Sequence, residues 1–179
     1  MKIAALLFCL LTVPVAAQDR AGNDTPGEWK VTHHTAFGLW DSMCDERQSG
    51  ETLEQRCYLR YVDVFSPHPK FGAIFAFIGP DNSVEFGFEQ GTAFKRNGFY
   101  AKTAGTRSWT MPHRPCLFGG ACQFEADQGA QLLETFSKAD ALVFDFVDRH
   151  GQAQVREWDM TVFAPALADH RAQSAARGL

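Results

Sequence analysis

The chain has 179 residues, of which 45% are hydrophobic, 21% charged and 13% aromatic, and its formal net charge is -4. This length fits one domain with tails, and the aromatic content excludes collagen and fully disordered proteins. The acidic balance argues against a nucleic-acid-binding protein, because such proteins are normally basic.

The first 17 residues have the pattern of a signal peptide that is removed on export. Lys2 provides a short positive region, residues 3–15 are apolar, and Ala17 ends a small-residue cleavage site. The apolar run is shorter than the roughly 20 residues that span a bilayer. No later segment is apolar enough to cross a membrane, so we expect an exported protein of the periplasm or cell envelope, or a secreted one. We expect a signal peptide at 1–17, a flexible lead-in at 18–28, one domain at 29–167 and a C-terminal tail at 168–179.

The middle of the chain has the pattern of short β-strands separated by turns. Aromatic and β-branched residues recur in short runs, and Pro, Gly, Asn and Asp stand between them. Val84, Phe86 and Phe88 alternate with Glu and Gly, which is the period of a half-buried strand. The expected strands here are 59–65, 71–78 and 84–88, and the segments 99–103 and 107–111 are secondary candidates.

Near the C-terminus we expect a hairpin and little helix. Residues 142–146 alternate, 148–151 offer turn chemistry, and 155–163 return as the second strand. The spacing of Leu132, Leu133 and Phe136 predicts one or two helical turns near 130–138, and the Ala-rich segment 164–177 predicts a frayed helix. This pattern favours an all-β sandwich, although a small barrel would give a similar one.

Strand spacing assigns the aromatic residues to a core rather than to a ligand groove. We expect Trp40 and the alternating Phe residues inside the domain, where they would fill the space between two sheets. Trp29 and Trp109 lie outside the best strands and are candidates for exposed contact residues, with a structural role as the alternative. The Phe residues assigned to the core are Phe75, Phe77, Phe86, Phe88, Phe144 and Phe146.

Several motifs, taken together in order, resemble the invasion-associated locus B family of exported bacterial proteins. They are FGLW at 37–40 before Cys44, QRCY at 55–58, CLFGGAC at 116–122, LVFDF at 142–146 and WDMTVFAPAL at 158–167. The segment VEFGFEQGTAF at 84–94 departs from the Pro- and Gly-containing apolar segment of that family. The resemblance implies an immunoglobulin-like β-sandwich, export to the envelope and a link to host-cell invasion or colonisation. It implies no enzymatic activity.

Four cysteines remain after the expected cleavage, and an even number in an exported chain indicates two disulfides. Of the three possible connectivities we expect Cys44–Cys57 and Cys116–Cys122. The first pair encloses residues 45–56, a polar stretch that we interpret as a loop between neighbouring strands.

No motif for catalysis, metal or cofactor binding emerges. His33 and His34 are adjacent and would point to opposite faces of a strand, and the other histidines are scattered. There is no nucleophile elbow and no phosphate-binding glycine pattern. A pair of glycosidase-type carboxylates stays open as an alternative, but we interpret the acidic cluster as a solvated loop. Its members are Asp41, Asp45, Glu46, Glu51 and Glu54.

These absences leave binding as the predicted function. We expect a non-catalytic envelope protein, without cofactor or metal, that binds an unidentified protein partner in the envelope or on a host cell. The contact point that we predict is the disulfide-closed loop with Leu117, Phe118, Gly119 and Gly120. The alternative for Phe118 is a lid folded back on the domain. Alternative functions are an inhibitor or chaperone-like module for another envelope protein and a small hydrolase.

Overall fold

The computed structural model describes residues 28–65, 72–120 and 122–179. The expected signal peptide at 1–17, all but the last residue of the lead-in at 18–28 and the first residue of the expected strand 71–78 lie outside the described residues.

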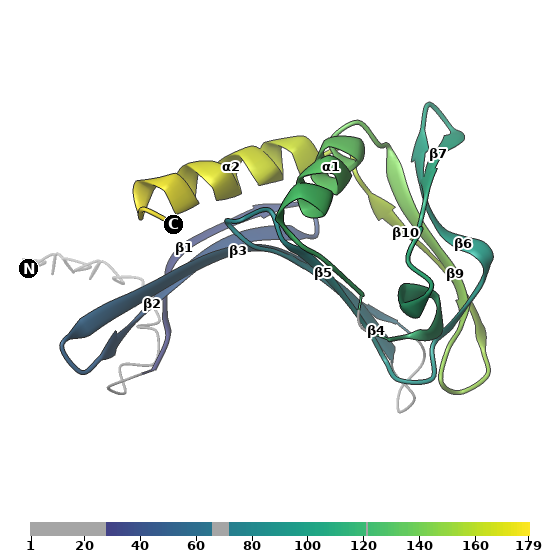
Figure 1. Ribbon diagram of the computed structural model, residues 1–179, viewed down its shortest axis with the longest axis horizontal. Coiled ribbons are helices and arrows are strands. Elements are labelled where there is room, and N and C mark those ends of the chain that lie inside the picture. Colours follow the sequence, from purple (N-terminus) through teal and green to yellow (C-terminus); the bar gives the residue numbers. More distant parts are fainter. Residues whose placement is uncertain (1–27, 66–71, 121) are drawn as a thin grey trace, which may run out of the picture.

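The described chain forms two antiparallel β-sheets and two α-helices (Figure 1). The six-stranded sheet has the order β1-β2-β3-β4-β5-β8, and the four-stranded sheet has the order β10-β9-β6-β7. The strands are β1 (Lys30–Phe37), β2 (Trp40–Ser49), β3 (Thr52–Phe65), β4 (Gly72–Ile78), β5 (Val84–Phe88), β6 (Ala93–Thr103), β7 (Thr106–Thr110), β8 (Cys122–Phe124), β9 (Ala141–Val147) and β10 (Ala153–Asp159). The helices are α1 (Ala126–Phe136) and α2 (Phe163–Ala176).

The first disulfide lies inside a long hairpin rather than across a loop. Cys44 in β2 is the direct register partner of Cys57 in β3, and the ladder continues outward to the pair Ser49–Thr52. The expected loop at 45–56 is therefore wrong, because only a tight turn separates the strands. Gly50 adopts φ 62° there, a left-handed conformation that glycine accepts without steric cost.

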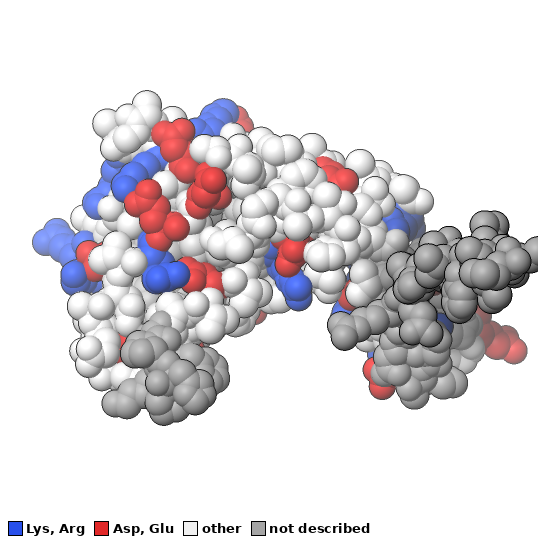
Figure 2. All heavy atoms as spheres, turned by 180° about the vertical axis from the view of Figure 1, so that it is seen from behind, with Lys and Arg blue, Asp and Glu red and all other residues white. Residues whose placement is uncertain are grey.

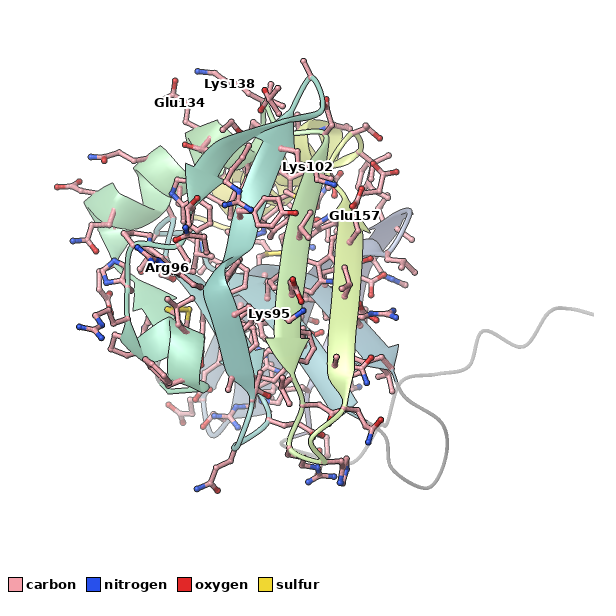
Figure 3. The ribbon with its side chains drawn as sticks, turned by 90° about the vertical axis from the view of Figure 1, so that its right-hand side faces the viewer. Lys95, Arg96, Lys102, Glu134, Lys138 and Glu157 are labelled. Carbon is pink, nitrogen blue, oxygen red and sulfur yellow. A yellow bond between two sulfur atoms is a disulfide. The ribbon has the colours of Figure 1, made fainter. Side chains whose placement is uncertain are left out.

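The expected hairpin near the C-terminus is present as β9 and β10. The Asp148 carboxylate closes the turn by accepting hydrogen bonds from the backbone N–H groups of His150 and Gln152, both at 2.9 Å. The second strand of this hairpin ends earlier than expected, since β10 stops at Asp159 and a helix begins at Phe163. The hairpin belongs to the four-stranded sheet, whose outer face is shown in Figure 3. That face carries charged side chains such as Lys102 and Glu157.

The inner faces of both sheets contribute to one hydrophobic core. Trp158 in β10 stacks on Tyr61 in β3 with ring centroids 4.0 Å apart, and Trp40 in β2 meets Trp158 edge-on at 6.0 Å. Phe144 in β9 contacts Phe86 in β5 in the same way at 6.5 Å. The expected burial of Trp40, Phe86, Phe144 and Phe146 is therefore confirmed, and Phe88 packs against the core while partly buried.

Phe75 and Phe77 are the exceptions among the residues assigned to the core. Ile74, Ala76 and Ile78 occupy the inner face of β4, so the two Phe side chains point to the opposite face and are half-buried there. The strand period was correct, but a continuous apolar strand does not reveal which of its two faces is the inner one.

The first helical segment is longer than expected, and the second has the expected length, shifted by one residue. Leu132, Leu133 and Phe136 form the buried stripe of the three-turn helix α1. Helix α2 packs on β1, β2 and β3, and it buries His170 and Ser174. Residues 168–176, which we expected to belong to a tail, therefore continue a helix that is part of the domain.

An ion pair joins the two sheets near the edge of the core. The Asp63 carboxylate in β3 accepts hydrogen bonds from Arg156 Nε and Nη2 in β10, at 2.9 and 2.7 Å. The indole N–H of Trp158 donates to the same carboxylate at 3.1 Å. Because the Asp63 side chain is only 8% exposed, these three donors replace the water that burial removes.

Candidate functional site

Residues 115–120 form a compact turn next to the disulfide between Cys116 and Cys122. The two cysteines are buried and form the expected disulfide. Residues Pro115–Phe118 form a short 3-10 helix, η1, and the backbone N–H of Gly120 donates to the carbonyl oxygen of Pro115 at 3.0 Å. The covalent bond and this hydrogen bond leave the turn little conformational freedom.

Gly119 shows why this turn contains glycine after the helix. Its φ is 65°, in the left-handed region, and it ends η1 as a C-cap. A Cβ atom at this position would lie 3.1 Å from the carbonyl oxygen of Thr92 and 3.3 Å from that of Glu89. The turn therefore packs closely against the connection between β5 and β6, which fixes it on the domain.

The two large apolar side chains of the turn have different surroundings. Leu117 is partly buried and packs against the core, whereas Phe118 is 68% exposed. The alternative in which Phe118 forms a lid on the domain is therefore not what the structure shows. Leu117 anchors the turn from within, and Phe118 projects from it into solvent.

A cavity of about 330 Å³ lies between the segments on either side of this turn. His113 stands edge-on to Phe124 at its rim, with ring centroids 4.7 Å apart. Sequence reasoning missed this cavity because its residues come from three segments that only tertiary packing brings together. They are Trp109, Pro112, His113, Phe124, Gln128, Gln131, Leu132 and Thr135.

Trp109 and Trp29, the two candidate contact residues, both have structural partners. Trp109 lies in β7, is partly buried, and meets Phe99 and Phe136 edge-on at 5.7 and 5.6 Å. Trp29 stacks against the guanidinium groups of two arginines of the β2–β3 hairpin, Arg47 at 4.6 Å and Arg56 at 3.9 Å.

The acidic cluster is not the solvated loop that we expected. Arg47 donates to Glu54, and Arg60 donates to Asp41 at 3.2 Å, so these carboxylates belong to ion pairs on the β2–β3 hairpin. Burial raises the pKa of Asp41, but hydrogen bonds from His34 and Arg60 outweigh it and the net pKa is lowered. The hydrogen bond from Arg47 likewise lowers the pKa of Glu54. A carboxyl group that acts as a general acid needs a raised pKa, whereas the pKa values of Asp41 and Glu54 are lowered.

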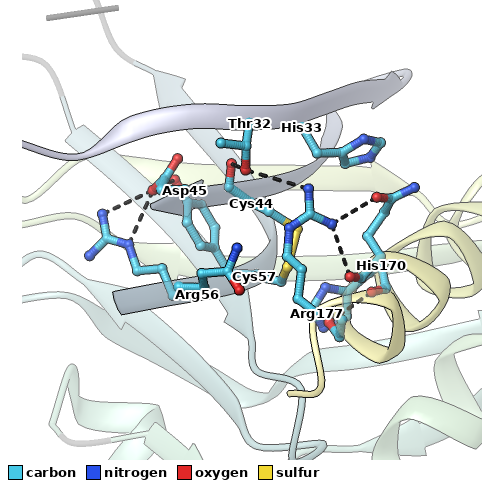
Figure 4. Close-up of a disulfide and its surroundings, with 12 residues drawn as sticks. Thr32, His33, Cys44, Asp45, Arg56, Cys57, His170 and Arg177 are labelled. Carbon is cyan, nitrogen blue, oxygen red and sulfur yellow. Dashed lines mark hydrogen bonds and ion pairs between the residues drawn. A yellow bond between two sulfur atoms is a disulfide. The ribbon is translucent and has the colours of Figure 1, made fainter. Parts of the chain in front are cut away.

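Figure 4 shows the first disulfide between an ion pair and the end of α2. On one side, Asp45 is buried and accepts hydrogen bonds from Arg56 Nε and Nη2 at 3.1 and 3.0 Å. On the other side, Arg177 donates to Thr32 Oγ1 at 3.4 Å. These contacts join the hairpin, β1 and α2 into one structural unit.

The histidines do not converge on a metal site in the part of the chain that the structure describes. His33 Nε2 lies 2.8 Å from Asp169 Oδ2 on the side of α2, and His34 Nε2 lies 2.9 Å from Asp41 Oδ1 on the other face. The expectation that these neighbours point to opposite faces is confirmed. Within the described residues, no helix is long and apolar enough to cross a membrane.

Comparisons with known proteins identify no relative of this chain: no family model matches it, and neither a curated protein nor a solved structure does.

Proposed function

We propose that this chain is an exported, non-catalytic protein of the cell envelope that binds a protein partner through Phe118. The observation that carries the proposal is the exposure of this aromatic side chain on a turn closed by a disulfide. Large exposed aromatic residues are frequent anchors in protein interfaces. Because the turn is already fixed, association would freeze few additional degrees of freedom, and less of the interaction energy would be lost to ordering.

The chemistry of the site supports binding rather than catalysis. Three carboxylates of the acidic cluster, Asp41, Asp45 and Glu54, pair with arginines, and the cysteines Cys116 and Cys122 pair with each other. Both disulfides support export, because such bonds persist in oxidising compartments. An amino-terminal signal peptide, periplasmic or secreted location and a role in host-cell invasion or colonisation belong to the same proposal.

For the fold, we propose an immunoglobulin-like β-sandwich of the invasion-associated locus B family. Two antiparallel sheets with a common aromatic core support the sandwich. The order of the motifs from FGLW at 37–40 to WDMTVFAPAL at 158–167 supports the family. Helix α2 is an addition to a simple sandwich, since it covers the part of the six-stranded sheet formed by β1, β2 and β3.

The proposed function is tested by Phe118→Ser in the mature protein, with Leu39→Ser as the matched control. Leu39 is 65% exposed at the tight turn between β1 and β2, so its exposure resembles that of Phe118. Each variant is used to capture partners from the native envelope, and its thermal unfolding is measured.

We expect Phe118→Ser to lose a partner that wild type and Leu39→Ser retain, with an unchanged melting temperature. A Phe118→Ser variant that melts several degrees lower and still binds would contradict the proposal. Capture of a cell-wall lytic enzyme would point to the inhibitor function as the specific form of binding.

A further inference from the structure

Among the described residues, no helix or strand covers the outer face of the six-stranded sheet, although Trp29 stacks on Arg47 and Arg56 at one end of it. The core, the four-stranded sheet and α2 all lie against its inner face. Figure 1 shows the sheet as an arch with the helices on its convex side, so that the outer face is the concave underside. Figure 2 shows the same molecule from behind as a space-filling surface that is hollowed on this underside. The long strands β2 and β3 run along the arch, and the hollow beneath it therefore runs across the strands.

One row of side chains crosses this face from strand to strand. The pairing register places Arg60 beside Asp41 and Phe77, and Glu85 beside Phe77 and Gln123. All five residues alternate with inner-face neighbours and so share the outer face. Each step along the row crosses one strand, a distance of about 4.8 Å. That spacing is close to the length of one sugar ring.

Aromatic rings form the floor of the hollow next to this row. Phe77 lies 5.9 Å from Tyr58 and 5.5 Å from Phe75, measured between ring centroids. Gly87 makes room for Phe75, because a Cβ atom at Gly87 would come within 1.7 Å of the ring. Val62, which is 44% exposed, is the register partner of Phe75 and extends the apolar floor. Half-buried rings with an open face are unusual on the solvent side of a sheet, where polar residues normally stand.

The polar groups of the hollow are planar, and its two arginines are paired with carboxylates. Arg56 and Arg60 line a space of about 450 Å³ together with Tyr58 and Phe77. Each arginine is paired with an aspartate, Arg56 with Asp45 and Arg60 with Asp41. Glu85 adds one more carboxylate to the same face. The hollow therefore has no excess of basic groups and does not attract a polyanion such as a nucleic acid.

We propose that this concave face binds an uncharged polysaccharide laid across strands β2, β3, β4, β5 and β8. The faces of aromatic rings accept the C–H groups of sugar rings. Carboxylate, guanidinium and amide groups offer acceptors and donors in the pairs that neighbouring hydroxyl groups require. A neutral chain of sugar rings suits a floor of aromatic rings that is flanked by polar groups and has no excess of basic charge. This site is separate from Phe118 and does not rest on the proposed protein partner.

The test measures binding of three uncharged oligosaccharides, cellohexaose, chitohexaose and maltohexaose, to the mature protein by calorimetry. Phe77→Ala removes the central ring, and Glu85→Ala changes an exposed group that contributes nothing to the core. Tyr100→Ala is the matched control, since Tyr100 is a half-buried aromatic residue that stacks with Arg107 at 3.9 Å in the other sheet.

We expect at least one oligosaccharide to bind, Phe77→Ala and Glu85→Ala each to weaken it about tenfold, and Tyr100→Ala to leave it unchanged. Failure of all three sugars to bind at millimolar concentration would overturn the proposal. The proposal would also be overturned if Phe77→Ala and Glu85→Ala both bound the oligosaccharide as tightly as wild type. It would likewise be overturned if the protein formed a dimer in solution that Phe77→Ala dissociates. Because the assay contains no protein partner, its outcome is independent of the Phe118 experiment.

Discussion

The ion pair between Asp63 and Arg156 gives the sharpest test of how the two sheets are held together. In the variant Arg156→Met, the apolar part of the side chain remains, but the guanidinium group is lost. Asp63 then keeps one of its three side-chain donors, the indole N–H of Trp158, although its own side chain is only 8% exposed. A buried carboxylate without a countercharge is strongly unfavourable.

The expected loss of stability is about 3 kcal/mol, the lower end of the range for breaking a buried ion pair, because Arg156 is itself 36% exposed. With a urea dependence of about 2 kcal/mol per molar, the unfolding midpoint falls by about 1.5 M. Unfolding is followed by circular dichroism at neutral pH. The control is Lys102→Met, which breaks the more exposed Lys102–Glu157 pair and is expected to cost less than about 1 kcal/mol.

The double variant Asp63→Leu with Arg156→Met completes the design. Because it removes both charges, it is expected to be more stable than Arg156→Met alone. The reasoning is refuted if Arg156→Met shifts the midpoint as little as the control does. It is also refuted if the double variant is the less stable of the two, since the uncompensated charge would then not be the cause.

Two further predictions concern the core and the dependence on pH. Phe144 is fully buried among aromatic rings. Phe144→Ala is therefore expected to lower the free energy of unfolding by about 3–5 kcal/mol, measured by urea unfolding. A change below about 1 kcal/mol would contradict the central place of Phe144 in the core. Burial lowers the pKa of His170 below its ordinary value of 6.5, and the Gly79 backbone acts in the opposite direction. The unfolded chain therefore binds a proton at His170 more readily than the folded chain does. As a result, the free energy of unfolding falls as the pH drops below 6.5. Between pH 7.5 and pH 5, the melting temperature of wild type is therefore expected to fall by several degrees more than that of His170→Leu, and equal shifts would show that this histidine is not responsible.

The strands could be predicted from the sequence because their signals are local. Alternation in 84–88 and the turn at 148–151 depend only on residues that are neighbours in the chain, and the structure has β5 and the β9–β10 hairpin there. The disulfide pairing was also predicted correctly, although the reason given for the first pair was wrong. Cys44 and Cys57 are joined because they face each other in the β2–β3 ladder, not because they close a loop.

The helices and the faces of strands were less predictable. Helix α2 has a broad Ala-rich surface with a weak pattern, and its position was fixed only by packing on β1, β2 and β3. In β4, every residue is apolar or Gly, so the sequence could not distinguish the inner Ile74 and Ile78 from the outer Phe75 and Phe77. The row from Asp41 to Gln123 likewise exists only once five strands are in register.

By itself, the sequence determined the β-rich character of this protein, the two disulfides and the loop that carries Phe118, because alternation, turn residues and cysteine spacing act over short stretches of chain. The tertiary structure decided that Phe118 is exposed to solvent, which acidic residues pair with arginines, and which aromatic residues lie on the outer face of the six-stranded sheet. These properties depend on contacts between residues far apart in the chain, and their geometry is set only when the two sheets and α2 enclose a common core.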